Sequence, residues 1–355
     1  MTESTYAREP PVGGRQPLPT VRTMTSSTST PSQILAYRLW VNHLALRLDR
    51  GHVDEAAFVG LQDSVPRSAL LSLHARVEEI EFESWDDSGL VQVWGPRGAV
   101  YVISRSDFAV FTLGRLPRNS GRRRVVEEDA ARIRDLLGRA DRPSLRTVTE
   151  GSVRRVREAA ASGTIGIRWD GSRIDVWSIE SPDDDAEACR RELARRYFRA
   201  FGPSTPPAFA IWAGIDRHDA DTTFERLRPE LVEVRLGGSV RWIPAETQDL
   251  LTAFDDAPDT TRVLPPGDAY LLTRDRALVV PDPVLRSRLW PQRNVPPGGV
   301  LLKGELVGTW RRHGHAFTIS SWRVIPSREK ELIEAEVAAM PPLATGQPSV
   351  TWTAI

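Results

Sequence analysis

Cysteine and lysine are both scarce in this chain of 355 residues. The single cysteine, Cys189, excludes an intramolecular disulfide and a zinc site built from several cysteines. No apolar run approaches the roughly 18–20 residues that a membrane-spanning helix needs, and the N-terminus lacks the basic-then-apolar pattern of a secretory signal. These absences favour a cytoplasmic protein that has no membrane partner.

The charge balance is neutral, with 47 basic and 47 acidic residues, so it does not by itself indicate a nucleic-acid partner. However, Lys303 and Lys330 are the only lysines, and every other basic residue is an arginine. The planar guanidinium group suits phosphates and base edges. A GC-rich genome would also enrich arginine, so the positions of the arginines are more informative than their total.

A helix-turn-helix pattern occupies residues 196–212. An amphipathic segment ends at Gly202-Pro203, and a second helix is predicted to begin with Thr205 as N-cap and Pro206 at its first position. A Gly-Gly hairpin follows at Gly237-Gly238. Together these elements predict a winged helix, a unit that typically binds DNA.

Similar patterns of helices followed by a hairpin precede this unit, and short strands follow it, among them one expected at Tyr270–Leu272. The fold class that we predict is α+β, with three tandem winged-helix units and a small C-terminal β-barrel or sheet domain. The expected boundaries are a disordered N-terminal tail at 1–31, winged helix 1 at 32–118, winged helix 2 at 119–182, winged helix 3 at 183–258, and a β-rich domain with a closing helix at 259–355.

Five sequence blocks, in this order and spacing, resemble a family of tandem winged-helix proteins. They are Gly60–Pro66, Trp94–Gly98 leading to Tyr101, Phe201–Thr205 continuing to Trp212, Leu264–Leu272 with Asp275-Arg276, and Gly304–Arg311. The family includes bacterial DNA glycosylases that act on bulky alkylated bases and interstrand crosslinks. The resemblance implies a C-shaped molecule around a channel for double-stranded DNA. We expect a monomer that needs neither a cofactor nor a metal.

The resemblance also implies a catalytic motif in the loop after the second helix, which reads Gln-x-Gln or Gln-x-Asp in glycosylase members. Gln62, Asp63 and Ser64 occupy that place here, so the second functional position is a serine and the carboxylate stands in the middle. A glutamine amide can orient a water, and a carboxylate can offset the charge of an oxocarbenium-like sugar. Alternatively, Asp63 or Ser64 caps the helix that begins near Ser68.

Arginine clusters provide candidate DNA contacts, with solvated helix faces as the alternative interpretation. The resemblance further implies that the hairpin around residue 312 approaches the lesion. The candidates are Arg97 at a wing tip, Arg118, Arg122, Arg123 and Arg124 at the junction of the first two units, Arg154, Arg155 and Arg157 on a short basic helix, and Arg311, Arg312 and His313 at the hairpin tip.

Three functions stay open at this point. One is a DNA glycosylase-like protein that hydrolyses the N-glycosidic bond of alkylated or bulky-adduct bases. Another is a non-catalytic DNA-binding protein of the same fold, which would act as a regulator or as a binder of damage or of a drug. The third is a scaffold that kept the fold and lost DNA binding, although the arginine run Arg122–Arg124 argues against it.

Overall fold

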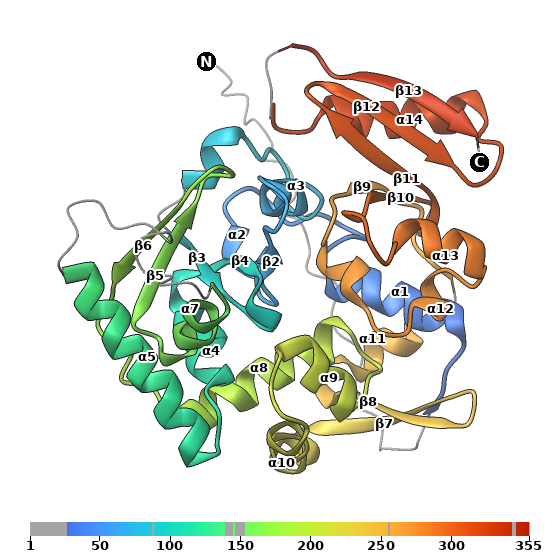
Figure 1. The fold of residues 1–355 in the computed structure, drawn as a ribbon. Helices are drawn as coiled ribbons and strands as arrows, with labels where there is room; N and C mark the ends of the chain where they lie inside the picture. The colour runs from blue at the N-terminus through green and yellow to red at the C-terminus, as the bar shows by residue number, and fades with distance from the viewer. Residues whose placement is uncertain are drawn as a thin grey trace, which may run out of the picture.

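The computed structural model describes residues 27–86, 89–138, 145, 153–254, 256–342 and 346–354. The fold is α+β, and its elements follow an arc from β3–β6 on the left of Figure 1, through α8–α10 at the bottom, to the C-terminal strands at the upper right. None of the described helices is long and apolar enough to cross a membrane. Residues 1–26 of the predicted tail lie outside the described residues.

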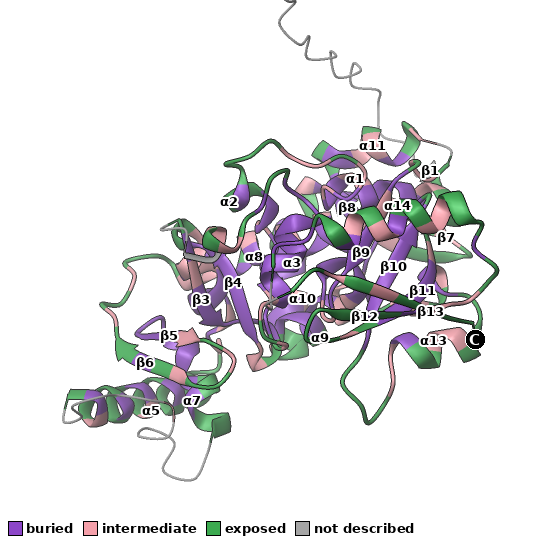
Figure 2. Cartoon of the chain, turned by 90° about the horizontal axis from the view of Figure 1, so that it is seen from above, coloured by how far each residue is buried: buried purple, intermediate pink, exposed green. Residues whose placement is uncertain are grey.

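The hairpins of the first two predicted units form one five-stranded sheet of order β2-β4-β3-β5-β6. The pair Gln92↔Ile167 joins the two hairpins. Figure 2 shows that α5, α7, β5 and β6 project to one side of the other elements. The elements of this region are α2 (Val53–Ala56), β2 (Leu61–Gln62), α3 (Ser68–His74), β3 (Leu90–Trp94), β4 (Val100–Ser104), α4 (Phe108–Thr112), α5 (Ser120–Gly138), α7 (Val153–Ala159), β5 (Ile165–Trp169) and β6 (Ile174–Ser178).

The third predicted unit contains the helices and the hairpin in the expected order. Thr205 is the N-cap of α9 and Pro206 its first residue, as the sequence indicates. The three helices α8, α9 and α10 share an aromatic core that includes Tyr197, Phe209 and Trp212. The elements are α8 (Ala186–Ala200), α9 (Pro206–Ala213), α10 (Arg217–Leu227), β7 (Leu231–Leu236), β8 (Ser239–Pro244) and α11 (Gln248–Thr252). The assignment of three winged helices remains a prediction.

The N-terminal elements attach to the third unit, which corrects two expectations. Strand β1 (Ser27–Thr28), expected within a disordered tail, pairs in parallel with β7. Helix α1 (Pro31–Val41), expected to open the first unit, packs its buried residues Ile34 and Tyr37 against β7, β8 and α11. The apolar face of α1 predicts that the helix is buried, but it does not reveal which distant strands cover that face.

The C-terminal strands form an open sheet of order β13-β12-β11-β10-β9. Among the described residues, its outer strands β9 and β13 do not pair with each other, so the structure contains the sheet and not the barrel. Helix α14 packs on this sheet through Ile333 and Val337. The elements are β9 (Thr261–Leu264), α12 (Arg276–Val279), α13 (Pro283–Leu289), β10 (Gly298–Leu302), β11 (Glu305–His313), β12 (Ala316–Ser321), α14 (Ser327–Ala338) and β13 (Ser349–Ala354).

The segment 265–276, which we call the bridging segment, is tied to the N-terminal half by two arginines. Arg76 donates two hydrogen bonds to Asp268, at 2.6 and 2.9 Å, where both side chains are essentially inaccessible to solvent. Arg38 of α1 donates two hydrogen bonds to Asp275, both 2.8 Å long. Asp268 also accepts a hydrogen bond from the Tyr270 amide, so the expected strand at 270–272 is instead a short turn of 3-10 helix.

Removing one partner of the Arg76–Asp268 pair should cost far more than removing both. Arg76→Leu leaves a buried, uncompensated carboxylate, and we expect a loss of roughly 3–5 kcal/mol in the free energy of unfolding. Arg76→Leu with Asp268→Leu should lose clearly less. Urea unfolding of the three proteins measures this difference, and a double variant as unstable as the single one would contradict it.

Candidate active site

Gln62 lies at the end of β2 with both ends of its carboxamide occupied. Its Nε2 donates to Ser64 Oγ at 2.9 Å, and Arg97 Nη2 donates to its Oε1 at 3.2 Å. A Cβ atom added to Gly267, in the bridging segment, would lie 3.2 Å from Gln62 Nε2. The amide is therefore held by a neighbour in its own loop, Ser64, and by two distant segments that contain Arg97 and Gly267.

Asp63 points to the opposite side of the chain, as expected for neighbouring residues at the end of a strand. Its side chain is buried, and the residue is 1% exposed. Its Oδ1 accepts a hydrogen bond from the Ala69 amide in the first turn of α3, and its Oδ2 accepts one from Gln92 Nε2 at 3.0 Å. The structure thus brings Gln62 and Ser64 together and separates Asp63 from both.

Burial raises the pKa of Asp63 to about 7, against the lowering effect of its hydrogen bonds from Ala69, Gln92 and Ser68. An ordinary aspartate ionises near pH 4. The ionisation of Asp63 is therefore coupled to the packing of the loop that carries Gln62.

A cavity of about 330 Å³ opens in front of Gln62 and Ser64. The bridging segment and the residues after α13 form its largely apolar wall, which includes Pro266, Leu271, Leu272, Leu289, Trp290, Val295, Pro296 and Pro297. Among the described residues that line it, none is an aspartate or glutamate. The cavity therefore combines a held amide, a hydroxyl and an apolar face.

Arg276 stands on the rim of this cavity and was not among the sequence candidates. Its guanidinium carbon lies 5.0 Å from the centre of the Trp290 ring, and its Nε has no hydrogen-bond partner among the described residues. Burial lowers the pKa of Arg276, and the nearby charges of Arg274 and Arg97 lower it further. In the sequence, Asp275 stands next to Arg276 and offsets its charge when local charges are counted. In the structure, Asp275 pairs with Arg38 and Arg241.

A second cavity, of about 220 Å³, continues the first toward the β11–β12 hairpin. The two cavities share Val65, Pro266 and residues 295–297, and the second is also lined by Arg311 and Arg312. Arg311 Nη2 donates to the Val295 carbonyl at 2.9 Å. The hairpin arginines therefore lie along the same hollow as Gln62, whereas His313 does not line either cavity.

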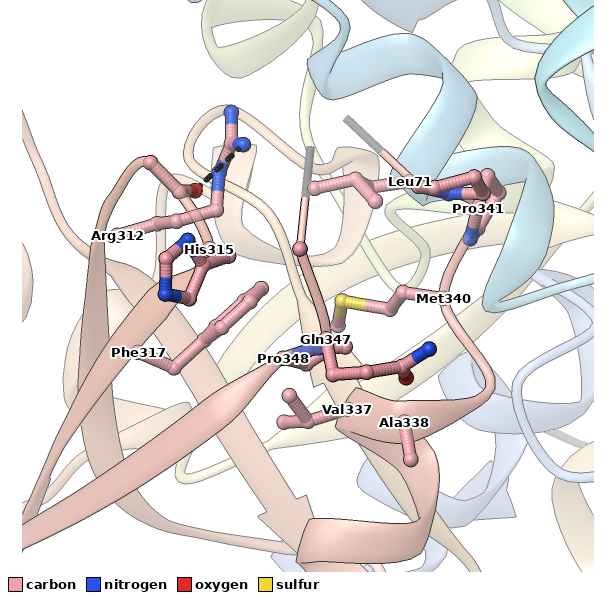
Figure 3. Close-up of a pocket in the computed structure, with 13 residues that line it drawn as sticks. Leu71, Arg312, His315, Phe317, Val337, Ala338, Met340, Pro341, Gln347 and Pro348 are labelled. Atoms are coloured by element: carbon pink, nitrogen blue, oxygen red, sulfur yellow. Dashed lines mark hydrogen bonds between the residues drawn. The ribbon is translucent and has the colours of Figure 1, made fainter. Parts of the chain in front are cut away.

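A third cavity, of about 260 Å³, lies on the other side of Arg312. Figure 3 shows Arg312 and His315 on one wall and Leu71, Met340 and Pro341 on the other. Arg312 Nη1 donates to the Gly314 carbonyl at 3.1 Å, the contact drawn as a dashed line.

The remaining candidate arginines are compensated by carboxylates to a much greater extent. Ion pairs join Arg118 to Glu187, Arg122 to Asp216, Arg123 to Glu127, Arg124 to Glu128 and Arg154 to Glu158. Arg155 also interacts with another group, and the exposed Arg157 lies against Gly98. By contrast, Arg97, Arg311 and Arg312 donate to neutral oxygen atoms, so their positive charge is not offset by these partners.

Comparison with known proteins identifies the class to which this fold belongs, that of the DNA glycosylase-like proteins. The sequence model of the family described as "DNA glycosylase AlkZ-like" matches residues 145–342. The chain belongs to the AlkZ-like DNA glycosylase family.

Among solved structures, the Streptomyces sahachiroi DNA glycosylase AlkZ superimposes with a TM-score of 0.74 at 19% sequence identity, over 92% of this chain and 100% of that chain. At this identity the likeness concerns the fold. No curated protein sequence matches the chain.

The raised pKa of Asp63 predicts a pH-dependent stability. The folded state keeps the Asp63 proton up to about pH 7 and the unfolded state loses it near pH 4, so the free energy of unfolding should fall as pH rises between these values. Between pH 5 and pH 6 the expected slope is roughly 1.4 kcal/mol per pH unit. Denaturant unfolding of the wild type and of Asp63→Asn measures it, and parallel pH profiles in the two proteins would contradict the assignment.

Proposed function

We propose that this protein hydrolyses the N-glycosidic bond of alkylated or bulky-adduct bases in double-stranded DNA, with Gln62 as its catalytic residue. The observation that carries the proposal is the held carboxamide of Gln62 at the wall of the cavity. Its Oε1 accepts one hydrogen bond from Arg97 and, as a carbonyl oxygen, can accept a second from a water molecule. Membership in the AlkZ-like DNA glycosylase family supports the same reaction class.

The chemistry requires little acid catalysis when the base is alkylated on a ring nitrogen. As the bond between C1′ and the base nitrogen breaks, its electron pair neutralises the cationic base, and positive charge develops on the sugar. A water bound to Gln62 Oε1 then attacks C1′ and releases its extra proton to solvent. The role of Gln62 is to orient this water and to stabilise charge through its carbonyl dipole.

Ser64 has a supporting role in this proposal. Its hydroxyl oxygen accepts the Gln62 Nε2 hydrogen, which keeps Oε1 directed toward Arg97 and away from Ser64. Asp63 makes no contact with the cavity, so we assign it no direct part in bond cleavage.

Arg97, Arg276, Arg311 and Arg312 are the phosphate contacts that we propose next to the reacting base, because they surround the two connected cavities. Arg157 lies beside the wing tip of Arg97 and would extend this surface, and His313 would follow at the hairpin tip. We propose the paired arginines at 118, 122–124 and 154 as a weaker zone, where phosphates must displace carboxylates, and Arg155 as a further contact on the same helix as Arg154.

One observation favours the alternative of a non-catalytic DNA-binding protein. No described aspartate or glutamate lines the cavity in front of Gln62, so no carboxylate faces the position where the sugar cation would form. A protein that retained DNA binding but released no base would fit this alternative.

Base release depends on Gln62 in this account. With a labelled duplex that contains N7-alkylguanine, we expect Gln62→Ala to lose at least ~100-fold in single-turnover excision, because the water is no longer oriented. The affinity for undamaged duplex should change little. Gln248→Ala, on α11, is the matched control and should retain wild-type excision. Excision by Gln62→Ala at the wild-type rate would contradict the assignment.

The cavity arginines should dominate the salt dependence of DNA binding. Arg97→Ala and Arg276→Ala should each reduce the slope of log affinity against log salt by about 0.9, the value for one lost phosphate contact. Arg124→Ala should have a smaller effect because Glu128 already pairs with it. Arg235→Ala, whose arginine pairs with Glu233 on β7, is the control. Titrations of undamaged duplex at several salt concentrations give the slopes, and equal slopes in all five proteins would contradict the proposed surface.

A further inference from the structure

The β5–β6 hairpin of the second unit lies against the back of the loop that carries Gln62. We call residues 62–68 the reaction loop. A Cβ atom on Gly171, at the hairpin turn, would lie 3.0 Å from Pro66 of the reaction loop. Gly171 has φ +101°, a backbone conformation that favours glycine, so the turn approaches the loop where a larger residue would be strained.

A buried chain of hydrogen bonds makes the same connection through side chains. Gln92 of β3 is 5% exposed, and its Nε2 donates to Asp63 Oδ2 at 3.0 Å. The backbone amide of Trp169, the last residue of β5, donates to Gln92 Oε1 at 2.6 Å. Gln92 Nε2 is also 3.3 Å from the Trp169 carbonyl oxygen.

The direction of these bonds is determined by the backbone amide of Trp169, which can only donate. Gln92 Oε1 must accept from it, so Nε2 must face Asp63, and position 63 must present an acceptor. Asp63 meets this requirement and, with its other oxygen, accepts from the Ala69 amide. Ser68 Oγ closes the loop by donating to the Gln62 carbonyl at 2.9 Å.

We propose that Asp63 and Gln92 are positioning residues that hold Gln62 and Ser64 in their reactive geometry, and that the second-unit hairpin is thereby part of the support of the reaction centre. The proposal rests on the proposed function. Asp63 stands between the two cavity residues, so a shift of Asp63 moves both of its neighbours. A misplacement of about 1 Å at a reacting group can cost roughly 100-fold in rate.

A polarity swap tests the pair. In Asp63→Asn, the amide nitrogen introduced at position 63 faces the Gln92 amide nitrogen, and in Gln92→Glu a second carboxyl group replaces the amide donor that faces Asp63. The double variant Asp63→Asn with Gln92→Glu restores one donor and one acceptor with the polarity reversed. The carboxylate introduced at position 92 can still accept from the Trp169 amide but loses the contact with the Trp169 carbonyl, so we expect strong but incomplete recovery.

The first readout is single-turnover excision of N7-alkylguanine, measured beside duplex affinity. Each single variant should excise roughly 10- to 100-fold more slowly, with affinity within about threefold of wild type, and the double variant should recover at least ~10-fold. Folded single variants that excise at the wild-type rate, or a double variant no faster than the slower single one, would overturn the proposal. Thermal unfolding verifies folding, and Gln92→Met, which removes the donor at similar volume, replaces any variant that fails to fold.

The second readout does not depend on catalysis. The side-chain amide signal of Gln62 in ¹⁵N-labelled protein is assigned by its loss in Gln62→Ala. In the wild type and the double variant this signal should indicate one fixed orientation of the carboxamide, and in the single variants it should indicate averaging over several orientations. A wild type that shows this pattern but releases no base would contradict the proposed function and support the positioning role. If the wild type releases the base but the Gln62 signal is the same in the wild type and in all variants, the positioning role is overturned and the proposed function is not.

Discussion

The buried pair of Arg76 and Asp268 is the interaction on which the position of the cavity in front of Gln62 depends. Together with the pair of Arg38 and Asp275, it attaches the bridging segment to the residues just after α3 and to α1. Buried ion pairs contribute little net stability compared with apolar replacements, but breaking one is costly. Such pairs therefore tolerate few alternative arrangements. The bridging segment supplies the wall in front of Gln62, so these two pairs determine where the cavity lies.

The cavity is assembled from three parts of the chain that lie far apart in sequence. Gln62 and Ser64 come from the reaction loop, Arg97 from the turn between β3 and β4, and Arg276 from the start of α12. Because neighbouring side chains at the end of a strand point to opposite sides, Gln62 and Ser64 face the cavity and Asp63 faces away from it. Arg97, Arg311 and Arg312 bond to neutral oxygens and Arg276 stacks on Trp290, whereas the arginines at the junction of the first two units pair with carboxylates.

Local patterns predicted the start of α9 and the β7–β8 turn, because proline suits the first position of a helix and Gly237 and Gly238 adopt the positive φ angles of a tight hairpin. The resemblance assigned Gln62 to a catalytic motif, and in the structure Gln62 lines a cavity, while its catalytic role remains a proposal. The sequence could not predict the long-range pairings. The apolar face of α1 does not indicate that β7 and β8 cover it. Residues 270–272 form a turn and not a strand because Asp268 accepts a hydrogen bond from the Tyr270 amide. The pairing of Arg122 with Asp216 was equally beyond the sequence, whereas Arg123 with Glu127 and Arg124 with Glu128 are i,i+4 pairs whose spacing the sequence does contain. Arg276 was not selected because Asp275 stands next to it.

The central claim is that the Gln62 carboxamide faces the sugar of the damaged nucleotide. The most direct measurement is a crystal structure with a duplex that carries a cationic iminosugar at the abasic position, because this group mimics the sugar cation of the transition state. The account predicts the iminosugar in the cavity beside Gln62, with a water between Gln62 Oε1 and the C1′ position. A complex in which the iminosugar lies outside this cavity, with Gln62 still bound only to Arg97 and Ser64, would contradict it.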